Sequence, residues 1–179
     1  MAFDPRDAIW NETHELLYNA SYLEEVAQIL LIRWTWLDSV SRIVVAIASA
    51  SSALAGFVFW KSSDYTFLWP LFTSASALLA IISRQLNVVE KVKHHAASAA
   101  EMASLAIDIG SFVVRMKVNP EFSVADFEKK LLAFRERYRL EIRNFQYDLL
   151  LTEGLRMQAQ SRLNAKRTGP RHEENHHGQ

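Results

Sequence analysis

The sequence predicts an all-α membrane protein, a two-transmembrane helical hairpin with an N-terminal amphipathic helix and long C-terminal helices. Two long charge-free stretches lie close together, helical apolar spacing flanks them, and no strand-type alternation of useful length is present. The composition alone, with 179 residues, 20 Lys+Arg, 20 Asp+Glu and 50% hydrophobic residues, describes an ordinary soluble domain. The class is therefore decided by how these residues are distributed along the chain.

The two charge-free stretches are residues 43–60 and 65–83, with 18 and 19 residues. As helices they would be about 27–29 Å long, close to the roughly 30 Å thickness of a bilayer's hydrocarbon core. Only the loop 61–64 separates them, so the pair predicts a transmembrane hairpin. The alternative is a pair of buried helices in a soluble bundle, where most helices keep one face in water.

Aromatic and basic residues indicate how the hairpin is oriented. Tryptophan and tyrosine collect at membrane interfaces. Those near the hairpin ends are Trp34, Trp36, Trp60, Tyr65 and Trp69. The basic residues on the terminal side of the two spans are Arg33, Arg42, Arg84, Lys91 and Lys93, against Lys61 alone in the loop. The positive-inside rule then places both termini in the cytoplasm.

The neutral total charge is a cancellation between two parts of the chain. Residues 1–42 carry three basic and seven acidic side chains, whereas residues 84–179 carry sixteen basic and twelve acidic ones. The net charges are thus −4 and +4, and we expect the two parts to attract each other.

The rest of the chain is predicted to be helical up to a polar tail. Residues 1–42 form an N-terminal helix that starts at Asp4-Pro5. The second span is expected to continue as a helix to about Lys117, since no breaker occurs before Asn119-Pro120. Together with a later helix it forms a cytoplasmic domain over 84–165. The tail 166–179 has no apolar content and is expected to be disordered.

The later helix is predicted to begin at Ser123, because Asp126 three residues on completes a capping-box-like start. Its apolar residues recur at steps of three and four: Phe127, Leu131, Phe134, Tyr138, Ile142, Phe145 and Leu149. This seam near heptad period should bury against the preceding helix or against a neighbouring subunit.

Small residues in the spans suggest close helix packing. Ala48 and Ser52, and Ser52 and Gly56, are four apart, a spacing that lets helix backbones approach. On the second span a small and polar stripe continues toward the cytoplasm: Thr73, Ser76, Ala80, Ser83, Asn87 and Glu90. In a ring of hairpins this stripe would line a pore. The alternative is that its hydroxyls bond back to their own helix.

A basic cluster lies on the later helix. Arg and Lys suit phosphate groups, and aromatic rings among them suit stacking on a base. The residues predicted to hold a nucleotide are Lys129, Lys130, Arg135, Tyr138, Arg139 and Arg143. The alternative is a solvated, salt-bridged helix face, with part of the charge meeting the acidic N-terminal helix.

Enzymatic chemistry has no sequence support. The absence of cysteine excludes disulfides, cysteine-based zinc sites and a thiol nucleophile. With five Gly there is no phosphate-binding loop, and no Ser/His/Asp spacing or paired carboxylates stand out. The histidines lack partners at ligand spacing. We therefore expect no catalytic residue, no metal site and no cofactor.

The order of parts resembles the SLATT family, the two-transmembrane effector domains associated with SMODS and SLOG proteins. Two stretches carry the resemblance: LLYNASYLEEVAQILLIRWTWLDSVSR (16–42) and QLNVVEKVKHHAASAAEMASL (85–105). In the second, Asn87, His95 and Leu105 match the family's Asn, His and Leu. Val88 departs from a frequent Pro, and Met102 from a frequent aromatic residue.

The resemblance implies a function that spacing does not show. SLATT proteins are pore-forming effectors of bacterial anti-phage defence in the inner membrane. A partner nucleotidyltransferase makes a nucleotide or oligonucleotide signal, and the effector then perturbs the membrane. The expectation is a homo-oligomer, a tetramer or larger, regulated by that signal at the cytoplasmic helices. The rival interpretation is a non-conducting membrane anchor or scaffold that recruits a partner through its cytoplasmic helix.

Overall fold

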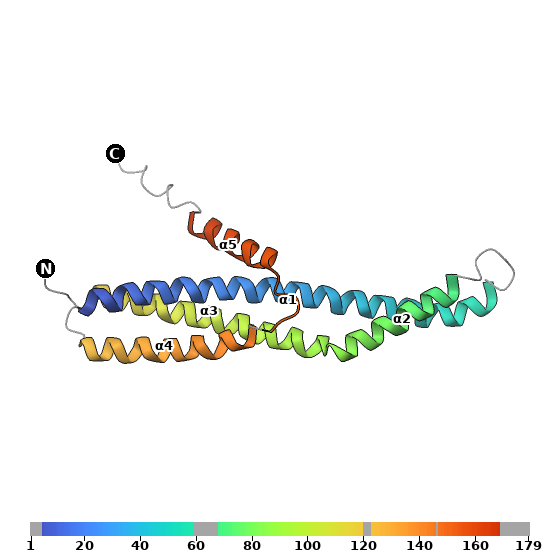
Figure 1. The fold of residues 1–179 in the computed structure, drawn as a ribbon, viewed down its shortest axis with the longest axis horizontal. Helices are drawn as coiled ribbons and strands as arrows, with labels where there is room; N and C mark the ends of the chain where they lie inside the picture. Colours follow the sequence, from blue (N-terminus) through green and yellow to red (C-terminus); the bar gives the residue numbers. More distant parts are fainter. Residues whose placement is uncertain (1–4, 59–67, 120–122, 146, 169–179) are drawn as a thin grey trace. The chain divides into compact units, whose positions relative to one another are not determined.

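A computed structural model describes residues 5–58, 68–119, 123–145 and 147–168, and in these ranges the protein is all-helical (Figure 1). Five helices follow one another along the chain. They are α1 (Pro5–Val58), α2 (Leu68–Gln85), α3 (Val88–Val118), α4 (Val124–Phe145) and α5 (Glu153–Thr168). The predicted all-α class is thereby confirmed. The predicted loop 61–64 and most of the tail lie outside the described residues.

The chain divides into two compact units. The terminal unit comprises residues 1–30 and 95–179, and the central unit comprises residues 31–94. These boundaries fall about ten residues outside the predicted limits of the spans at 43 and 83. The central unit therefore contains both predicted spans together with the segments that lead into and out of them.

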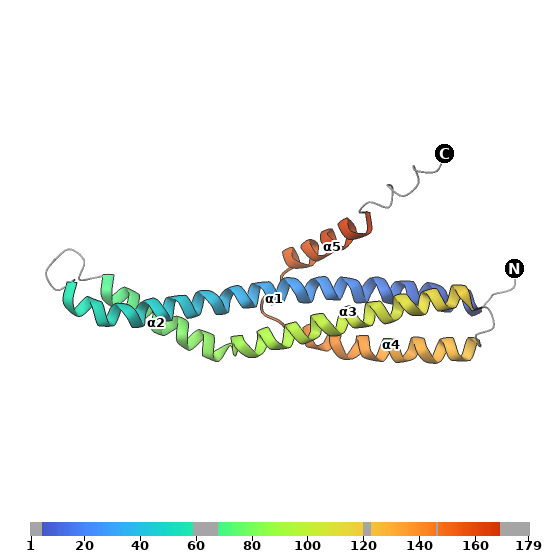
Figure 2. The same cartoon turned by 180° about the vertical axis from the view of Figure 1, so that it is seen from behind.

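The terminal unit has its core where α1, α3 and α4 run side by side (Figures 1 and 2). Aromatic packing joins α3 to α4, because the Phe112 ring meets the rings of Phe127 and Phe134 at centroid distances of 5.5 and 5.6 Å. The buried apolar side chains of this core are Leu16, Ala20, Leu23, Met102, Leu105, Ile109, Phe112, Phe127, Leu131 and Phe145. Helices of this kind bury one apolar stripe and leave the opposite face in water.

Helix α4 follows its sequence prediction closely. The Ser123 hydroxyl accepts a hydrogen bond from the Asp126 amide at 3.1 Å and donates one to the Asp126 carboxylate at 2.6 Å. This confirms the predicted start of the helix. The predicted seam is buried at Phe127, Leu131 and Phe145 and partly buried at Phe134 and Tyr138, while Ile142 and Leu149 are exposed.

Helix α5 was not predicted as a separate element. Thr152 caps it, since the Leu155 amide donates to the Thr152 hydroxyl at 3.3 Å. Its buried residues Leu155, Ala159 and Leu163 are four apart and form one face. The helix ends at Thr168, so residues 166–168 are helical rather than part of a disordered tail.

In the central unit, α2 returns alongside the C-terminal part of α1 (Figure 1). The predicted continuous helix from the second span to Lys117 is wrong, because the chain breaks at Leu86 and Asn87. Asn87 has φ 47°, a left-handed conformation that ends α2, and its carbonyl then accepts the Lys91 amide at 3.0 Å as α3 begins. Asparagine tolerates this conformation better than most residues.

Among the described residues, one helix is long and apolar enough to cross a membrane by length and composition, namely α3, which contains an 18-residue stretch with a mean hydropathy of 1.4. This helix also supplies Met102, Leu105 and Ile109 to the core of the terminal unit. A core helix passes the same test of length and apolarity, so the finding is weak support for a membrane span at α3.

Candidate functional site

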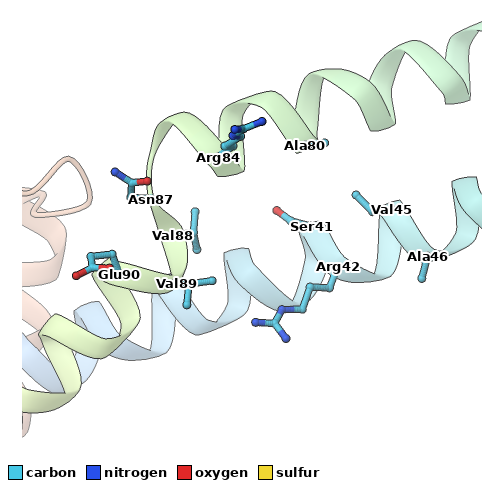
Figure 3. Close-up of a pocket in the computed structure, with 10 residues that line it drawn as sticks. All are labelled: Ser41, Arg42, Val45, Ala46, Ala80, Arg84, Asn87, Val88, Val89 and Glu90. Atoms are coloured by element: carbon cyan, nitrogen blue, oxygen red, sulfur yellow. The ribbon is translucent and has the colours of Figure 1, made fainter.

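The central unit contains a cavity of about 540 Å³ between α1, α2 and the start of α3 (Figure 3). Its walls are partly apolar and partly polar. The lining residues are Ser41, Arg42, Val45, Ala46, Ala80, Arg84, Asn87, Val88, Val89 and Glu90. Ser41, Val45 and Val88 point into the gap, while the Arg42 side chain leaves α1 on the side away from α2 and Glu90 points out of the gap (Figure 3).

The predicted pore stripe lies along this cavity. Ala80, Asn87 and Glu90 line it, and Ser76 is buried, each of them in the company of residues of the same chain. The side chains of Thr73 and Ser83 lie outside the described residues. Within one chain, the buried Ser76 and the cavity-lining Ala80 therefore belong to the packed side of α2, whereas Asn87 and Glu90 lie beyond α2 and are exposed. The break at Asn87 also interrupts the regular helical spacing on which the stripe was predicted.

The remaining surface of the central unit exposes large apolar side chains. Ile47 is 57% exposed and Leu78 is 60% exposed. The exposed large apolar residues near the predicted spans are Ile43, Val45, Ile47, Leu78, Ile81 and Ile82. Trp36 is 66% exposed, as an interfacial aromatic residue should be, whereas Trp34 is 1% exposed and belongs to the interior instead.

In the terminal unit, the predicted basic cluster makes ion pairs with neighbouring helices. Arg135 pairs with Glu12 of α1, which confirms the expected attraction between the acidic and basic parts of the chain. Arg139 pairs with Glu136 on its own helix at 3.1 Å. Tyr138 is half-buried, and burial raises the pKa of its hydroxyl above the ordinary 10.0. The alternative of a salt-bridged helix face therefore describes much of the cluster.

Arg137 makes the most extensive of these contacts. Its Nη1 donates to Asp108 at 2.7 Å, and its Nη2 donates to Glu101 at 2.7 Å. The hydrogen bond to Asp108, and to a lesser extent the hydrogen bond to Glu101, raises the pKa of the Arg137 guanidinium above its ordinary value. Both carboxylates belong to α3, so this pair joins α4 to α3.

The cluster does not converge on one point. At about 100° per residue, Lys129, Arg135, Arg139 and Arg143 fall within about 120° around α4, while Lys130 projects to another side. Lys129 and Arg143 are also fourteen residues apart on one helix, roughly 21 Å along its axis. Because Arg135 is paired with Glu12 of α1, one chain leaves three of the predicted residues on a common face, without closing a pocket around a nucleotide.

A buried polar pair in the terminal unit was not predicted as a site. The His95 ring meets the Asp148 carboxylate at 2.8 Å, and both side chains are fully buried. Asp148 also accepts the Leu150 amide at 2.9 Å, so it holds the connection between α4 and α5 against α3. The sequence does not predict this pair, because a partner 53 residues away gives no local signal.

Helix α5 is attached to α1 by polar contacts as well as by its apolar face. Lys166 pairs with Glu25, whose side chain is 2% exposed, and Gln160 donates to the Tyr18 hydroxyl. The Arg167 guanidinium stands over the Tyr18 ring at 5.2 Å. Burial raises the pKa of Tyr22 on the same face of α1.

Comparison of the chain with protein-family models, with curated proteins and with solved structures found no match. The function of the protein is therefore inferred from the residues and the geometry of its two units.

Proposed function

We propose that the protein is an oligomeric membrane effector whose central unit inserts into a bilayer as a helical hairpin. The terminal unit is its helical domain in the cytoplasm. The observation that carries this proposal is the density of exposed large apolar side chains in the central unit, which among the described residues exposes nine of them, as many as the much longer terminal unit. Soluble monomers rarely expose contiguous apolar surface of this kind.

Exposed apolar side chains lose the free energy that burial away from water would supply. Burying one Ile, Leu or Val side chain away from water stabilises a protein by about 1.5–3 kcal/mol. Ile43, Ile47, Leu78 and Ile82 gain only part of this within the chain, because 48–60% of each residue stays exposed. A bilayer supplies the missing apolar surroundings, and the helices satisfy their own backbone hydrogen bonds, as a spanning segment must.

The effector part of the proposal is a pore. One hairpin cannot enclose a lumen, so conduction requires a homo-oligomer, a tetramer or larger, with its second spans toward the axis. The resemblance to the SLATT family supports this part, together with the setting of anti-phage defence in a bacterial inner membrane. Assembly then has to separate the small-residue stripe of α2 from α1, or to build the lumen from both helices.

The signal in this proposal is a nucleotide or oligonucleotide, which is made by an associated nucleotidyltransferase and received by the terminal unit. Lys129, Arg139 and Arg143 are the predicted ligands that share an exposed side of α4. Because these cations are spread along the helix, they suit an extended oligonucleotide or a site completed by a second subunit.

Conductance tests the pore directly. The protein reconstituted in vesicles should release ions when the signal is present, and Ala80→Asn should change the conductance. Ala77→Asn is the matched control, since Ala77 is exposed on α2 and does not line the cavity. Intact membranes under every triggering condition would refute the pore.

A second candidate is a non-conducting membrane anchor that presents the terminal unit to a partner. The placement of Ser76 and Ala80 toward α1 of the same chain favours it, because small residues then serve hairpin packing. An anchor would keep its membrane association while neither Ala80→Asn nor the signal produced any conductance.

A further inference from the structure

The cavity of the central unit combines an apolar wall with charges of both signs. Val45, Ala46, Ala80, Val88 and Val89 supply the apolar part. The charged lining residues are Arg42, Arg84 and Glu90. A wholly polar ligand would leave the apolar wall uncovered, and a wholly apolar ligand would leave the charges without partners. The lining therefore suits an amphiphile with a charged head.

The positive charges come from two different helices. Arg42 belongs to α1 and Arg84 to the last turn of α2. The Arg42 Nε donates to Asp38 at 2.9 Å, and the Arg42 side chain is 70% exposed. This ion pair uses Nε, which orients the guanidinium while its two terminal nitrogens can serve another acceptor. Paired N–H groups of this kind bind phosphate oxygens.

The negative charges decide which phosphate-bearing ligand fits. Glu90 lines the same cavity, and Asp38 pairs with Arg42, so two carboxylates balance the charge of the two arginines. Such a balance gives no net attraction for a multiply charged anion. It matches a zwitterionic head, with a phosphate for the guanidinium groups and a cation for the carboxylate that lines the cavity.

The apolar surface continues away from the charges. Val45 and Val89 line the cavity and are also exposed. Ile43 and Ile82, which are close in sequence to lining residues, are exposed as well. Acyl chains would cover these side chains. In the proposed topology Arg42 and Arg84 stand at the cytoplasmic ends of the two spans, where basic pockets between helices receive lipid headgroups.

We propose that this cavity binds the headgroup of a phospholipid that carries a primary ammonium. Its phosphate lies against Arg84, the exposed Arg42 side chain turns toward that phosphate on binding, and its ammonium donates hydrogen bonds to Glu90. The inference rests on the proposed function, because it requires the central unit to be inserted in a bilayer. It adds a ligand class that neither the pore nor the anchor interpretation includes.

The test measures which lipid the full-length protein retains. The protein in mild detergent is mixed with equal amounts of phosphatidylethanolamine, phosphatidylglycerol and phosphatidylcholine, and bound lipid is quantified by native mass spectrometry. We expect phosphatidylethanolamine to exceed each of the others about fivefold, a difference of about 1 kcal/mol. Phosphatidylcholine has no N–H donor for Glu90, and phosphatidylglycerol has no cation.

Two variants separate the roles of the charges. Arg84→Gln should reduce the retention of all three lipids, whereas Glu90→Gln should remove the preference for phosphatidylethanolamine and keep the binding. The matched control is Lys93→Gln, since Lys93 is an exposed cation of the same unit outside the cavity. Circular dichroism checks that each variant keeps its helical content.

The outcomes distinguish this inference from the proposed function. Equal retention of the three lipids by a protein that stays in alkali-washed membranes overturns the headgroup site and leaves the membrane effector standing. Displacement of the lipid by equimolar soluble glycerophosphoethanolamine also overturns it, because the ligand is then a free headgroup. A protein that leaves the membrane on washing overturns both.

Discussion

The two units of this protein divide similar residue types differently between interior and surface. The terminal unit buries a core that includes Leu105 and Phe112, although it also exposes apolar side chains such as Ile107 and Leu140. The central unit exposes as many large apolar side chains, among them Ile47 and Leu78, over a much shorter part of the chain. Composition cannot distinguish these arrangements, because both units are helical and rich in Ala, Leu, Ile and Val. The comparison teaches that the share of apolar side chains left on the surface, rather than their total number, indicates the surroundings of each unit.

Charged side chains are also arranged differently in the terminal and central units. In the terminal unit, ion pairs join different helices, as between Arg137 and Glu101 or between Lys166 and Glu25. In the described part of the central unit, the charges lie outside the two predicted spans, at Arg33, Asp38, Arg42, Arg84, Glu90, Lys91 and Lys93. A helical unit in water uses charge for its surface and its helix contacts, whereas a membrane hairpin keeps charge at its ends.

The largest effect should come from charge placed on the exposed apolar surface of the central unit. Leu78→Asp combined with Ile82→Asp replaces two side chains that favour hydrocarbon, at a cost of roughly 6 kcal/mol for insertion. We expect the variant to leave the membrane fraction on sedimentation. The control is Ile107→Asp with Leu140→Asp, two exposed apolar residues of the terminal unit, and it should stay in the membrane. Equal behaviour of the two variants would break the comparison.

The core of the terminal unit provides the next largest effect. Leu105 is fully buried on α3, and Leu105→Ala should lower the free energy of unfolding by about 3 kcal/mol. Ile107 lies two residues away and is 68% exposed, so Ile107→Ala should change it by less than about 0.5 kcal/mol. Chemical denaturation followed by circular dichroism measures both values. A large loss for Ile107→Ala would mean that α3 has a covered outer face.

The buried polar pair predicts a somewhat smaller loss. Asp148→Ala removes the partner of the His95 ring and the acceptor of the Leu150 amide, at a cost of about 2 kcal/mol. Amide hydrogen exchange should rise in α5 and in the segment before it. Asp108→Ala, which removes an exposed partner of Arg137, serves as the control with a cost of about 0.5 kcal/mol. Unchanged exchange in α5 after Asp148→Ala would show that the pair does not hold the connection.

The smallest effect concerns alkaline pH. Burial raises the pKa of Tyr138 in the folded protein, so its contribution to stability is present below pH 10 and is lost as the pH rises through the folded value. Tyr138→Phe should therefore lessen the loss of stability above pH 10. Thermal unfolding of both proteins at pH 9 and pH 11 measures the difference. An identical pH dependence would place Tyr138 in water.

Local signals predicted the parts of the fold that depend on neighbouring residues. The Ser123 cap, the start at Pro5 and the buried positions of α4 all follow from spacing within one helix. The opposite charges of the two ends also predicted attraction, and the Arg135–Glu12 pair confirms it. These features need only helical periodicity and Coulomb attraction, which a sequence displays directly.

The remaining features depend on contacts between distant parts of the chain. The break at Asn87 has neither Gly nor Pro to announce it, although an Asn can adopt a positive φ. The His95–Asp148 pair and the Gln160–Tyr18 contact join residues 53 and 142 positions apart. The small-residue stripe was visible, but its spacing could not tell whether it faces a lumen or the neighbouring helix.

The central claim is that the exposed apolar side chains of the central unit lie in lipid, and the absence of cysteine permits a direct measurement. Single substitutions Ile47→Cys and Leu78→Cys report on the central unit, and Ile107→Cys reports on an equally exposed apolar residue of the terminal unit. Each is exposed to a membrane-impermeant maleimide in open membranes. The account predicts rapid labelling at position 107, and labelling at 47 and 78 only after detergent is added. Equal and rapid labelling at all three positions without detergent would contradict it.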